Sequence, residues 1–223
     1  MHRECFTPTG WKVLAALRDT VNKHNAVLAG GTALALHLGH RKSVDLDFFT
    51  TSTSSFRVET VISVIRKTGL NFRIMSEAED YLVCEIEGVK FSLFRYEYPF
   101  IDTVSSYEGT NVAGVLDIAA MKIIDIVQRG TKRDFVDMYF ILQQVPFYKI
   151  ADHMVRRFGV ERVNPIHIGK ALTYFTDADS NSEPEYTKEK VKWEKVKAFF
   201  VRYTKQFVLD LRNAVQNGQG DRS

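Results

Sequence analysis

The sequence is poor in cysteine and in long apolar runs. Its 223 residues include only two cysteines, Cys5 and Cys84, with no Cys-x-x-Cys spacing between them. This scarcity disfavours a disulfide framework and a zinc site, and it is typical of a reducing cytoplasm. No apolar run approaches the roughly 18 residues that a membrane span needs, and the N-terminus lacks the apolar core of a signal peptide. We therefore expect a soluble, cytoplasmic protein with no membrane partner.

The chain also has little excess of either charge. The formal net charge is +3, which does not by itself indicate a nucleic-acid partner. Apolar residues make up 45% of the chain and charged residues 26%, which is ordinary for a globular protein. The length suits one domain of moderate size or two small ones.

Strand and helix patterns alternate in the first half of the chain. We expect helices over Trp11–His24 (capped by Thr9), Thr32–Leu38 and Phe56–Lys67 (capped from the Thr/Ser run 50–55), and strands over Ala26–Ala29, Val44–Thr50, Asn71–Met75, Tyr81–Glu87 and Val89–Tyr96. The last three strands are expected to form an antiparallel meander, and Pro99–Asn111 a loop.

The second half reads as helical. We expect helices over Leu116–Gln128, Lys132–Gln144, Phe147–Phe158, Pro165–Phe175 and about Thr187–Val215, with a loop over Asp177–Glu185. The order predicts an α+β fold with two parts: a core of residues 1–112, and a helical domain of residues 113–223 that packs on it and contributes to the active site.

Two carboxylates stand at the start of the second expected strand. Because side chains alternate along a strand, Asp45 and Asp47 point to one face, and Leu46 and Phe48 point to the other. A divalent cation would relieve the repulsion between the two acids, and Mg²⁺ prefers such oxygen ligands. The alternative for an isolated Asp-x-Asp is a strand end with two solvated acids.

A glycine turn strengthens the first interpretation. Gly30 and Gly31 follow a buried strand and open a helix, and Thr32 stands 13 residues before Asp45. Glycines let the backbone approach a triphosphate closely, and the N–H groups of a helix N-terminus bind phosphate. Thr32 could cap the helix or give its hydroxyl to a phosphate oxygen. A phosphate-binding turn beside a metal site predicts nucleotide chemistry.

These residues resemble a known family. Gly30-Gly31-Thr32 with His40–Phe49, and then Leu116–Lys122, Arg129 and Lys132–Phe140, are similar to the AbiEii/AbiGii-type nucleotidyltransferases, toxins of the polymerase-β-like nucleotidyltransferase superfamily. The resemblance covers residues from about 26 to 142. It implies a nucleotidyltransferase-type mixed sheet with flanking helices, followed by a C-terminal helical bundle.

The resemblance also implies roles for individual residues. Gly30, Gly31 and Thr32 would form the phosphate turn, and Asp45 and Asp47 would bind the metal, Mg²⁺ or Mn²⁺. Lys122 matches the lysine of the third family motif, and Asp134 and Asp137 fall in the fourth. The implied reaction moves a nucleoside monophosphate (NMP) from a nucleoside triphosphate (NTP) to an acceptor.

Several of these roles have a plainer alternative. Lys122 on an apolar helix could reach a triphosphate or lie along the surface. Asp134 and Asp137 share one helical face, where they could form ion pairs, orient Lys122 or activate the attacking hydroxyl. Arg41 could contact phosphates or belong to a solvated basic turn. Ser43 could bind the strand end or the nucleotide.

One departure from the wider superfamily concerns a third carboxylate. Many members carry it on a neighbouring strand, but the candidate strand Val89–Tyr96 has no acid. Glu85 on the preceding strand is a possible substitute, although a surface position explains it better. The sequence therefore leaves open one metal or two.

We expect a metal-dependent nucleotidyltransferase with NTP as substrate and tRNA or another RNA as acceptor, paired with a cognate antitoxin. A basic face on the last expected helix suits RNA. That face comprises Lys188, Lys190, Lys192, Lys195, Lys197, Arg202 and Lys205. The alternatives are a nucleotide- or RNA-binding module that has lost catalysis, and a small-molecule nucleotidyltransferase.

Overall fold

The structure is a computed structural model that describes residues 1–51 and 56–220. It divides into two compact units, Met1–Gly114 and Val115–Ser223. The described part of the first unit contains strands and helices, and that of the second contains helices without strands. Across residues 1–51 and 56–220, every helix is too short or too polar to cross a membrane.

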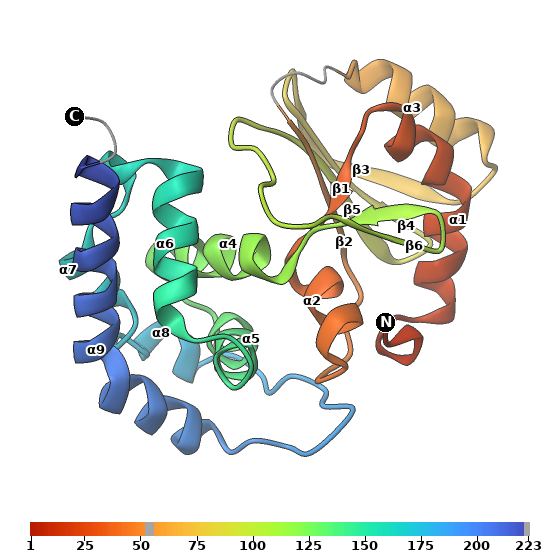
Figure 1. Ribbon diagram of the computed structural model, residues 1–223. Helices are drawn as coiled ribbons and strands as arrows, with labels where there is room; N and C mark the ends of the chain where they lie inside the picture. The colour runs from red at the N-terminus through yellow and green to blue at the C-terminus, as the bar shows by residue number, and fades with distance from the viewer. Residues whose placement is uncertain (52–55, 221–223) are drawn as a thin grey trace. The chain divides into compact units, whose positions relative to one another are not determined.

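The first unit is built on a seven-stranded mixed sheet (Figure 1). Its strands are β1 (Val27–Leu28), β2 (Leu46–Thr51), β3 (Phe72–Ala78), β4 (Tyr81–Ile86), β5 (Val89–Tyr96), β6 (Ser105–Tyr107) and β7 (Thr110–Val112). They lie in the order β3-β4-β5-β2-β1-β7-β6, with β2 parallel to β5 and β1 parallel to β7. The other neighbours are antiparallel, so the expected β3-β4-β5 meander and the α+β class are confirmed.

The helices of this unit flank the sheet. They are α1 (Pro8–Lys23), α2 (Gly30–Leu38) and α3 (Val58–Lys67), with a short 3-10 helix η1 (Arg3–Cys5) at the start. Figure 1 shows α1 and α3 on the same side of the strands. Fully buried apolar side chains on β2, β4 and β5 share one parity; they are Leu46, Phe48, Leu82, Cys84, Ile86, Phe91 and Leu93. Ser92, of the opposite parity on β5, is fully buried as well. Residues of the opposite parity, including Asp47, therefore face away from this core.

Helix starts in this unit differ from the expected ones by a few residues. Thr7, rather than Thr9, caps α1: its Oγ1 accepts a hydrogen bond from the Gly10 amide at 3.0 Å, and Pro8 takes the first helical position. Helix α3 begins at Val58, after Arg57, which provides no side-chain cap. Of the Thr/Ser run expected to cap it, residues 52–55 lie outside the described part of the chain.

A hairpin replaces most of the loop expected over Pro99–Asn111. Strands β6 and β7 pair antiparallel through a turn at Glu108 and Gly109, whose φ angles are 50° and 72°. Two successive positive φ angles match the twist of a two-residue hairpin. Strand β7 then pairs with β1 and extends the sheet.

The second unit is helical throughout its described residues. Its helices are α4 (Val115–Gln128), α5 (Lys132–Leu142), α6 (Phe147–Phe158), η2 (Val160–Arg162), α7 (Pro165–Ala171), α8 (Thr176–Asp179) and α9 (Trp193–Gly220). Helix α8 begins the stretch expected as a loop. Helix α9 starts six residues later than expected and runs past Val215, so Lys188, Lys190 and Lys192 precede it.

Aromatic rings form the core of the second unit. Phe135 of α5 contacts Phe175, Trp193 and Phe200 at ring-centroid distances of 5.1 to 5.9 Å. Phe147 of α6 stacks on Phe207 of α9 at 4.2 Å. The buried face of α9 thus includes Phe200 and Phe207, as its apolar spacing predicts.

Candidate functional site

The glycine turn after β1 lies directly against an aspartate of β2. Gly30 has a φ of 65°, a conformation that favours glycine, and a Cβ placed there would stand 3.3 Å from Asp47 Oδ2. Helix α2 begins at Gly30, and no side chain among the described residues caps its N-terminus. The carboxylate and the first amides of the helix therefore line one small space.

Asp47 is held in this position by the sheet. The Ala29 amide donates to the Asp47 carbonyl at 3.0 Å, which joins the end of β1 to β2. Leu46 and Phe48, on either side, are fully buried in the core. Asp45 precedes the first strand residue, and both Asp45 and Asp47 are partly exposed. Alternation along β2 places the Asp47 carboxylate on the face of the sheet opposite α1 and α3.

Thr32 and Ser43 connect the helix to the loop before β2. Thr32 Oγ1 lies 2.8 Å from Ser43 Oγ and donates to the Asp45 carbonyl. The Ser43 amide in turn donates to the Cys5 carbonyl at 2.8 Å. Thr32 does not cap α2; its hydroxyl fixes the backbone of Asp45 relative to that helix. The expected contact of Thr32 with a phosphate oxygen stays a prediction.

Arg41 packs over the glycine turn. A Cβ at Gly31 would stand 2.5 Å from Arg41 Nη2, and Arg41 Nη1 donates to the Lys42 carbonyl at 2.9 Å. The side chain is buried, with 3% of the residue exposed. The alternative of a solvated basic turn is therefore wrong for Arg41. Its guanidinium adds a positive charge to the amides of the glycine turn, which favours an anion there.

The site offers two carboxylates, and Ser92 stands where a third could be. In the parallel β2–β5 pairing, Ser92 is the direct neighbour of Asp47. Glu85 does not supply the missing acid: it pairs across strands with Lys90, and its Oε2 lies 3.4 Å from Arg73 Nη2. Within residues 1–51 and 56–220, no cluster of three or more His, Cys, Asp or Glu side chains could hold a metal.

The site residues expected in the second unit form their own buried cluster. The ammonium of Lys122 on α4 lies 2.7 Å from Asp134 Oδ1 and 3.1 Å from Asp137 Oδ2, both on α5. Asp134 also closes a capping box, accepting from the Thr131 amide at 3.2 Å and from Thr131 Oγ1 at 2.6 Å. Lys122 is 5% exposed, so it is not a surface lysine. Asp134 Oδ2 also lies 3.8 Å from Arg129 Nε. The structure thus shows ion pairs of these aspartates with both Lys122 and Arg129, and activation of the attacking hydroxyl stays a prediction.

A second ionic cluster in this unit was missed from the sequence. Asp117 of α4 is fully buried, with His153 Nε2 at 2.8 Å and Arg157 Nη1 at 3.2 Å from its Oδ1. His153 and Arg157 lie one turn apart on α6, so their spacing could have indicated a shared partner. The contacts fasten α6 to the helix that carries Lys122.

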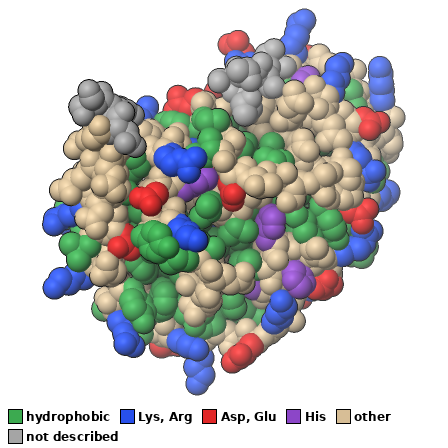
Figure 2. Space-filling view, viewed as in Figure 1, with side chains coloured by type: hydrophobic (Ala, Val, Ile, Leu, Met, Phe, Trp, Pro, Cys, Tyr) green, Lys and Arg blue, Asp and Glu red, His purple; other side chains and the backbone are tan. Residues whose placement is uncertain are grey.

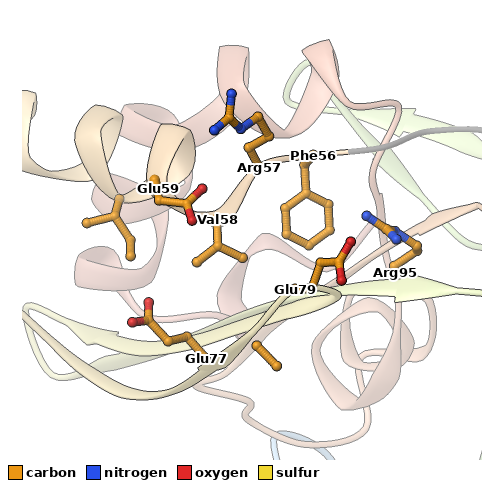
Figure 3. Close-up of a pocket in the computed structure, with 9 residues that line it drawn as sticks. Phe56, Arg57, Val58, Glu59, Glu77, Glu79 and Arg95 are labelled. Carbon is orange, nitrogen blue, oxygen red and sulfur yellow. The ribbon is translucent and has the colours of Figure 1, made fainter.

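A separate pocket lies in the first unit, away from these residues. It has a volume of about 590 Å³ and is lined by Phe56, Arg57, Val58, Glu59, Ile62, Glu77, Ala78, Glu79 and Arg95. Figure 3 shows Phe56, Glu79 and Arg95 gathered at one end of it. Because Arg95 follows Phe94 on β5, this pocket opens on the opposite face of the sheet from Asp47.

Comparison with known proteins identifies a family for this chain. Residues 12–110 match the family model described as nucleotidyl transferase AbiEii toxin, of a type IV toxin–antitoxin system. An uncharacterized protein of Aquifex aeolicus is 35% identical over 184 residues, which are 81% of this chain and 87% of the relative.

Two solved structures share the fold over nearly the whole chain. A candidate nucleotidyltransferase from H. pylori has a TM-score of 0.58 at 15% identity, covering 96% of this chain and 98% of its own. The nucleotidyltransferase toxin MenT4 of Mycobacterium tuberculosis has a TM-score of 0.54 at 16% identity, covering 92% and 90%. On the evidence of the family model and this extended similarity, the chain belongs to the AbiEii family of nucleotidyltransferase toxins.

Proposed function

We propose that this nucleotidyltransferase uses Mg²⁺ or Mn²⁺ to transfer an NMP from an NTP to an RNA acceptor, with tRNA as the first candidate. The observation that carries the proposal is the contact between Asp47 and the Gly30–Gly31 turn, where a carboxylate, helix amides and the Arg41 guanidinium share one site. Amides and guanidinium attract phosphate, and the carboxylates attract a cation that phosphate also binds.

The residues present fit a magnesium ion. Asp45 and Asp47 are two oxygen ligands, and Mg²⁺ commonly takes one or two carboxylates, with waters and substrate phosphates in the remaining positions. When bound, such an ion polarises the phosphoryl oxygens and offsets charge that develops on the leaving group. The two carboxylates support one such ion more directly than two.

The chain's own residues would position and neutralise the triphosphate. We assign the α2 amides and Arg41 to its phosphates, and Lys122 to a second contact of the same kind, with Asp134 and Asp137 orienting the lysine. Gly30, Gly31, Thr32, Ser43 and Asp137 complete the nucleotide-binding set, Thr32 and Ser43 by fixing the backbone. Binding and orientation supply most of the catalysis in phosphoryl transfer.

In the reaction, a hydroxyl oxygen of the acceptor bonds to the α-phosphorus, and the bond from that phosphorus to the α–β bridging oxygen breaks. Pyrophosphate leaves with the bond's electron pair. We assign the hydroxyl proton to the Asp45–Asp47 pair, because Asp134 already accepts hydrogen bonds from Lys122 and from two Thr131 groups.

An RNA acceptor is supported by the basic side chains near α9. Lys190, Lys192, Lys195, Arg202 and Lys205 are exposed. On the face shown in Figure 2, Lys and Arg side chains are spread over the surface and do not form one large patch. The support for RNA is therefore the series of exposed cations along and just before α9, which could contact a phosphate backbone at several points, with affinity that falls as salt rises. We also propose a cytoplasmic location and a cognate antitoxin, as the family description of a toxin–antitoxin system suggests.

The test is transfer of labelled nucleotide. Purified protein with Mg²⁺ and each of the four α-labelled NTPs should label total tRNA, and EDTA or the Asp45→Asn variant should abolish the label. Asp80→Asn, in the turn between β3 and β4, is the matched control and should remain active. Absence of label with every NTP, over broad RNA and protein acceptors, would contradict the proposal.

The missing third acid supports a second candidate, a nucleotide- or RNA-binding module with the same fold and impaired catalysis. Ser92, rather than an acid, adjoins Asp47. NTP binding that is indifferent to Mg²⁺, together with absence of transfer, would favour this module.

A further inference from the structure

The face of the sheet that carries Asp47 also carries a row of aromatic rings. The row consists of Tyr81 on β4, Phe94 on β5, Phe49 on β2, Tyr96 at the end of β5 and Tyr98 in the segment after it. Consecutive ring centroids are 6.2, 5.4, 5.4 and 5.4 Å apart. We call these five residues the aromatic row.

The pairing of the strands produces the row. Phe49 is the direct neighbour of Phe94 in the parallel β2–β5 pair, and Tyr81 faces Phe94 across the antiparallel β4–β5 pair. Cross-strand neighbours point to the same face of a sheet. Phe49 is two residues beyond Asp47 on β2, so alternation puts the row and the carboxylate on one face.

Burial separates this face from the core. Along β4, Leu82, Cys84 and Ile86 are fully buried, whereas Tyr81 and Val83 are half-buried. Phe49, Phe94 and Tyr96 are half-buried as well. Exposing a contiguous group of aromatic rings to water costs free energy. Surface patches of this kind mark binding sites.

The position of the aromatic row beside Asp47 indicates which of the two substrates, NTP or acceptor, it would contact. Strand β2 lies between β1 and β5. The glycine turn follows β1, so the phosphates of the NTP are expected on that side, and the row extends from the other side, over β5 and β4. In the proposed reaction, this leaves the side of the row for the acceptor.

The length of the row distinguishes a polynucleotide from a single base. Each stacked base uses roughly one aromatic side chain, whereas the row has five. The base of one NTP would leave most of it uncovered. Every base has an apolar face, and unpaired RNA is recognised by stacking on Phe and Tyr.

We propose that the aromatic row binds unpaired nucleobases of the RNA acceptor and so delivers its end to Asp47. This inference rests on the proposed function, because it names the form in which the RNA is bound: a single-stranded end rather than a duplex.

Binding of RNA to the full chain, measured by fluorescence anisotropy, tests the row without requiring transfer. The probes are a labelled single-stranded RNA of about ten nucleotides and a blunt hairpin of equal length. Variants Phe94→Leu and Tyr81→Leu remove a ring and keep an apolar side chain. Tyr148→Leu, which removes an exposed ring on α6, is the matched control.

We expect the wild type to prefer the single strand, and each row variant to bind it roughly 5- to 100-fold more weakly. Tyr148→Leu should bind as the wild type does. Phe94→Trp, which keeps a ring at the same position, should retain binding and shows that the site folds. NTP binding, measured by calorimetry, should be the same in all variants.

Two results would overturn the inference. Equal RNA binding by wild type and row variants would show that the row is not the acceptor site, and loss of NTP binding alone would assign it to the NTP base. Failure of the proposed function gives a different pattern. The wild type would then neither transfer an NMP nor bind NTP, whether or not the row variants bind RNA more weakly.

Discussion

The carboxylate of Asp47 lies so close to Gly30 that a methyl group on the glycine would stand 3.3 Å from Oδ2. The same glycine has a φ of 65°. A side chain at this position would thus strain the backbone and also displace the carboxylate that we assign to the metal.

Gly30→Ala separates these two effects when it is compared with Gly69→Ala. Gly69 has a similar φ of 70°, but a Cβ there would meet nothing within 4 Å. Both variants should lose about 1 to 2 kcal/mol of unfolding free energy, because both place alanine in the left-handed region. Only Gly30→Ala should lose NMP transfer. Urea denaturation and the transfer assay measure the two effects, and equal activity of the variants would contradict the role of Gly30.

Thr32→Val removes a hydroxyl that joins α2 to the loop before β2. Ser43 Oγ and the Asp45 carbonyl would each lose a hydrogen-bond partner. The expected cost is about 1 to 3 kcal/mol of stability, with weaker Mg²⁺-dependent NTP binding because Asp45 is no longer fixed. Thr32→Ser keeps the hydroxyl and should behave nearly as the wild type in urea denaturation and calorimetry. A fully stable, fully binding Thr32→Val would show that the hydroxyl has no such role.

Lys122→Met leaves two buried carboxylates without their shared cation. Asp134 and Asp137 are 2% and 0% exposed. Breaking a buried ion pair on one side costs about 3 to 5 kcal/mol, so the variant should unfold at much lower urea. The added change Asp137→Asn should restore part of that loss. Lys149→Met, at an exposed position on α6, should change little, and similar stability of the two single variants would contradict the ion-pair assignment.

The Cys84 thiol should be inert in the folded protein. Burial raises its pKa to about 12, so hardly any thiolate is present near neutral pH. Iodoacetamide at pH 8 should therefore modify Cys84 only after denaturation, as mass spectrometry would show. Modification in the native state at the rate of an exposed cysteine would mean that β4 is not packed as described.

Much of the first unit could be predicted because its signals are local. Asp45 and Asp47, Gly30 and Gly31, and the apolar face of α3 all follow from spacing within a few residues. The hairpin β6–β7 was not predicted because its strands are three residues long, although Glu108-Gly109 was a turn signal. The sequence predicts the start of α9 six residues too early, because Lys188–Lys192 consists mostly of helix-forming residues. The helix begins only at Trp193, whose ring packs in the core of the unit.

The neighbours within the site could not be predicted in the same way. The pairing of Asp47 with Ser92, and of Phe49 with Phe94, joins strands 45 residues apart in parallel, and no short-range pattern encodes that register. The burial of Arg41 and the ion pairs of Lys122 likewise depend on contacts between elements. Sequence spacing left their alternatives open, and packing decided between them.

Calorimetric titration of a non-hydrolysable NTP, with and without Mg²⁺, tests the central claim most directly. The account predicts that Mg²⁺ strengthens NTP binding by the wild type and that this gain disappears in Asp47→Asn, while Asp80→Asn keeps it. An equal effect of Mg²⁺ on the wild type and on Asp47→Asn would contradict the assignment of the metal and the triphosphate to the space between Gly30 and Asp47.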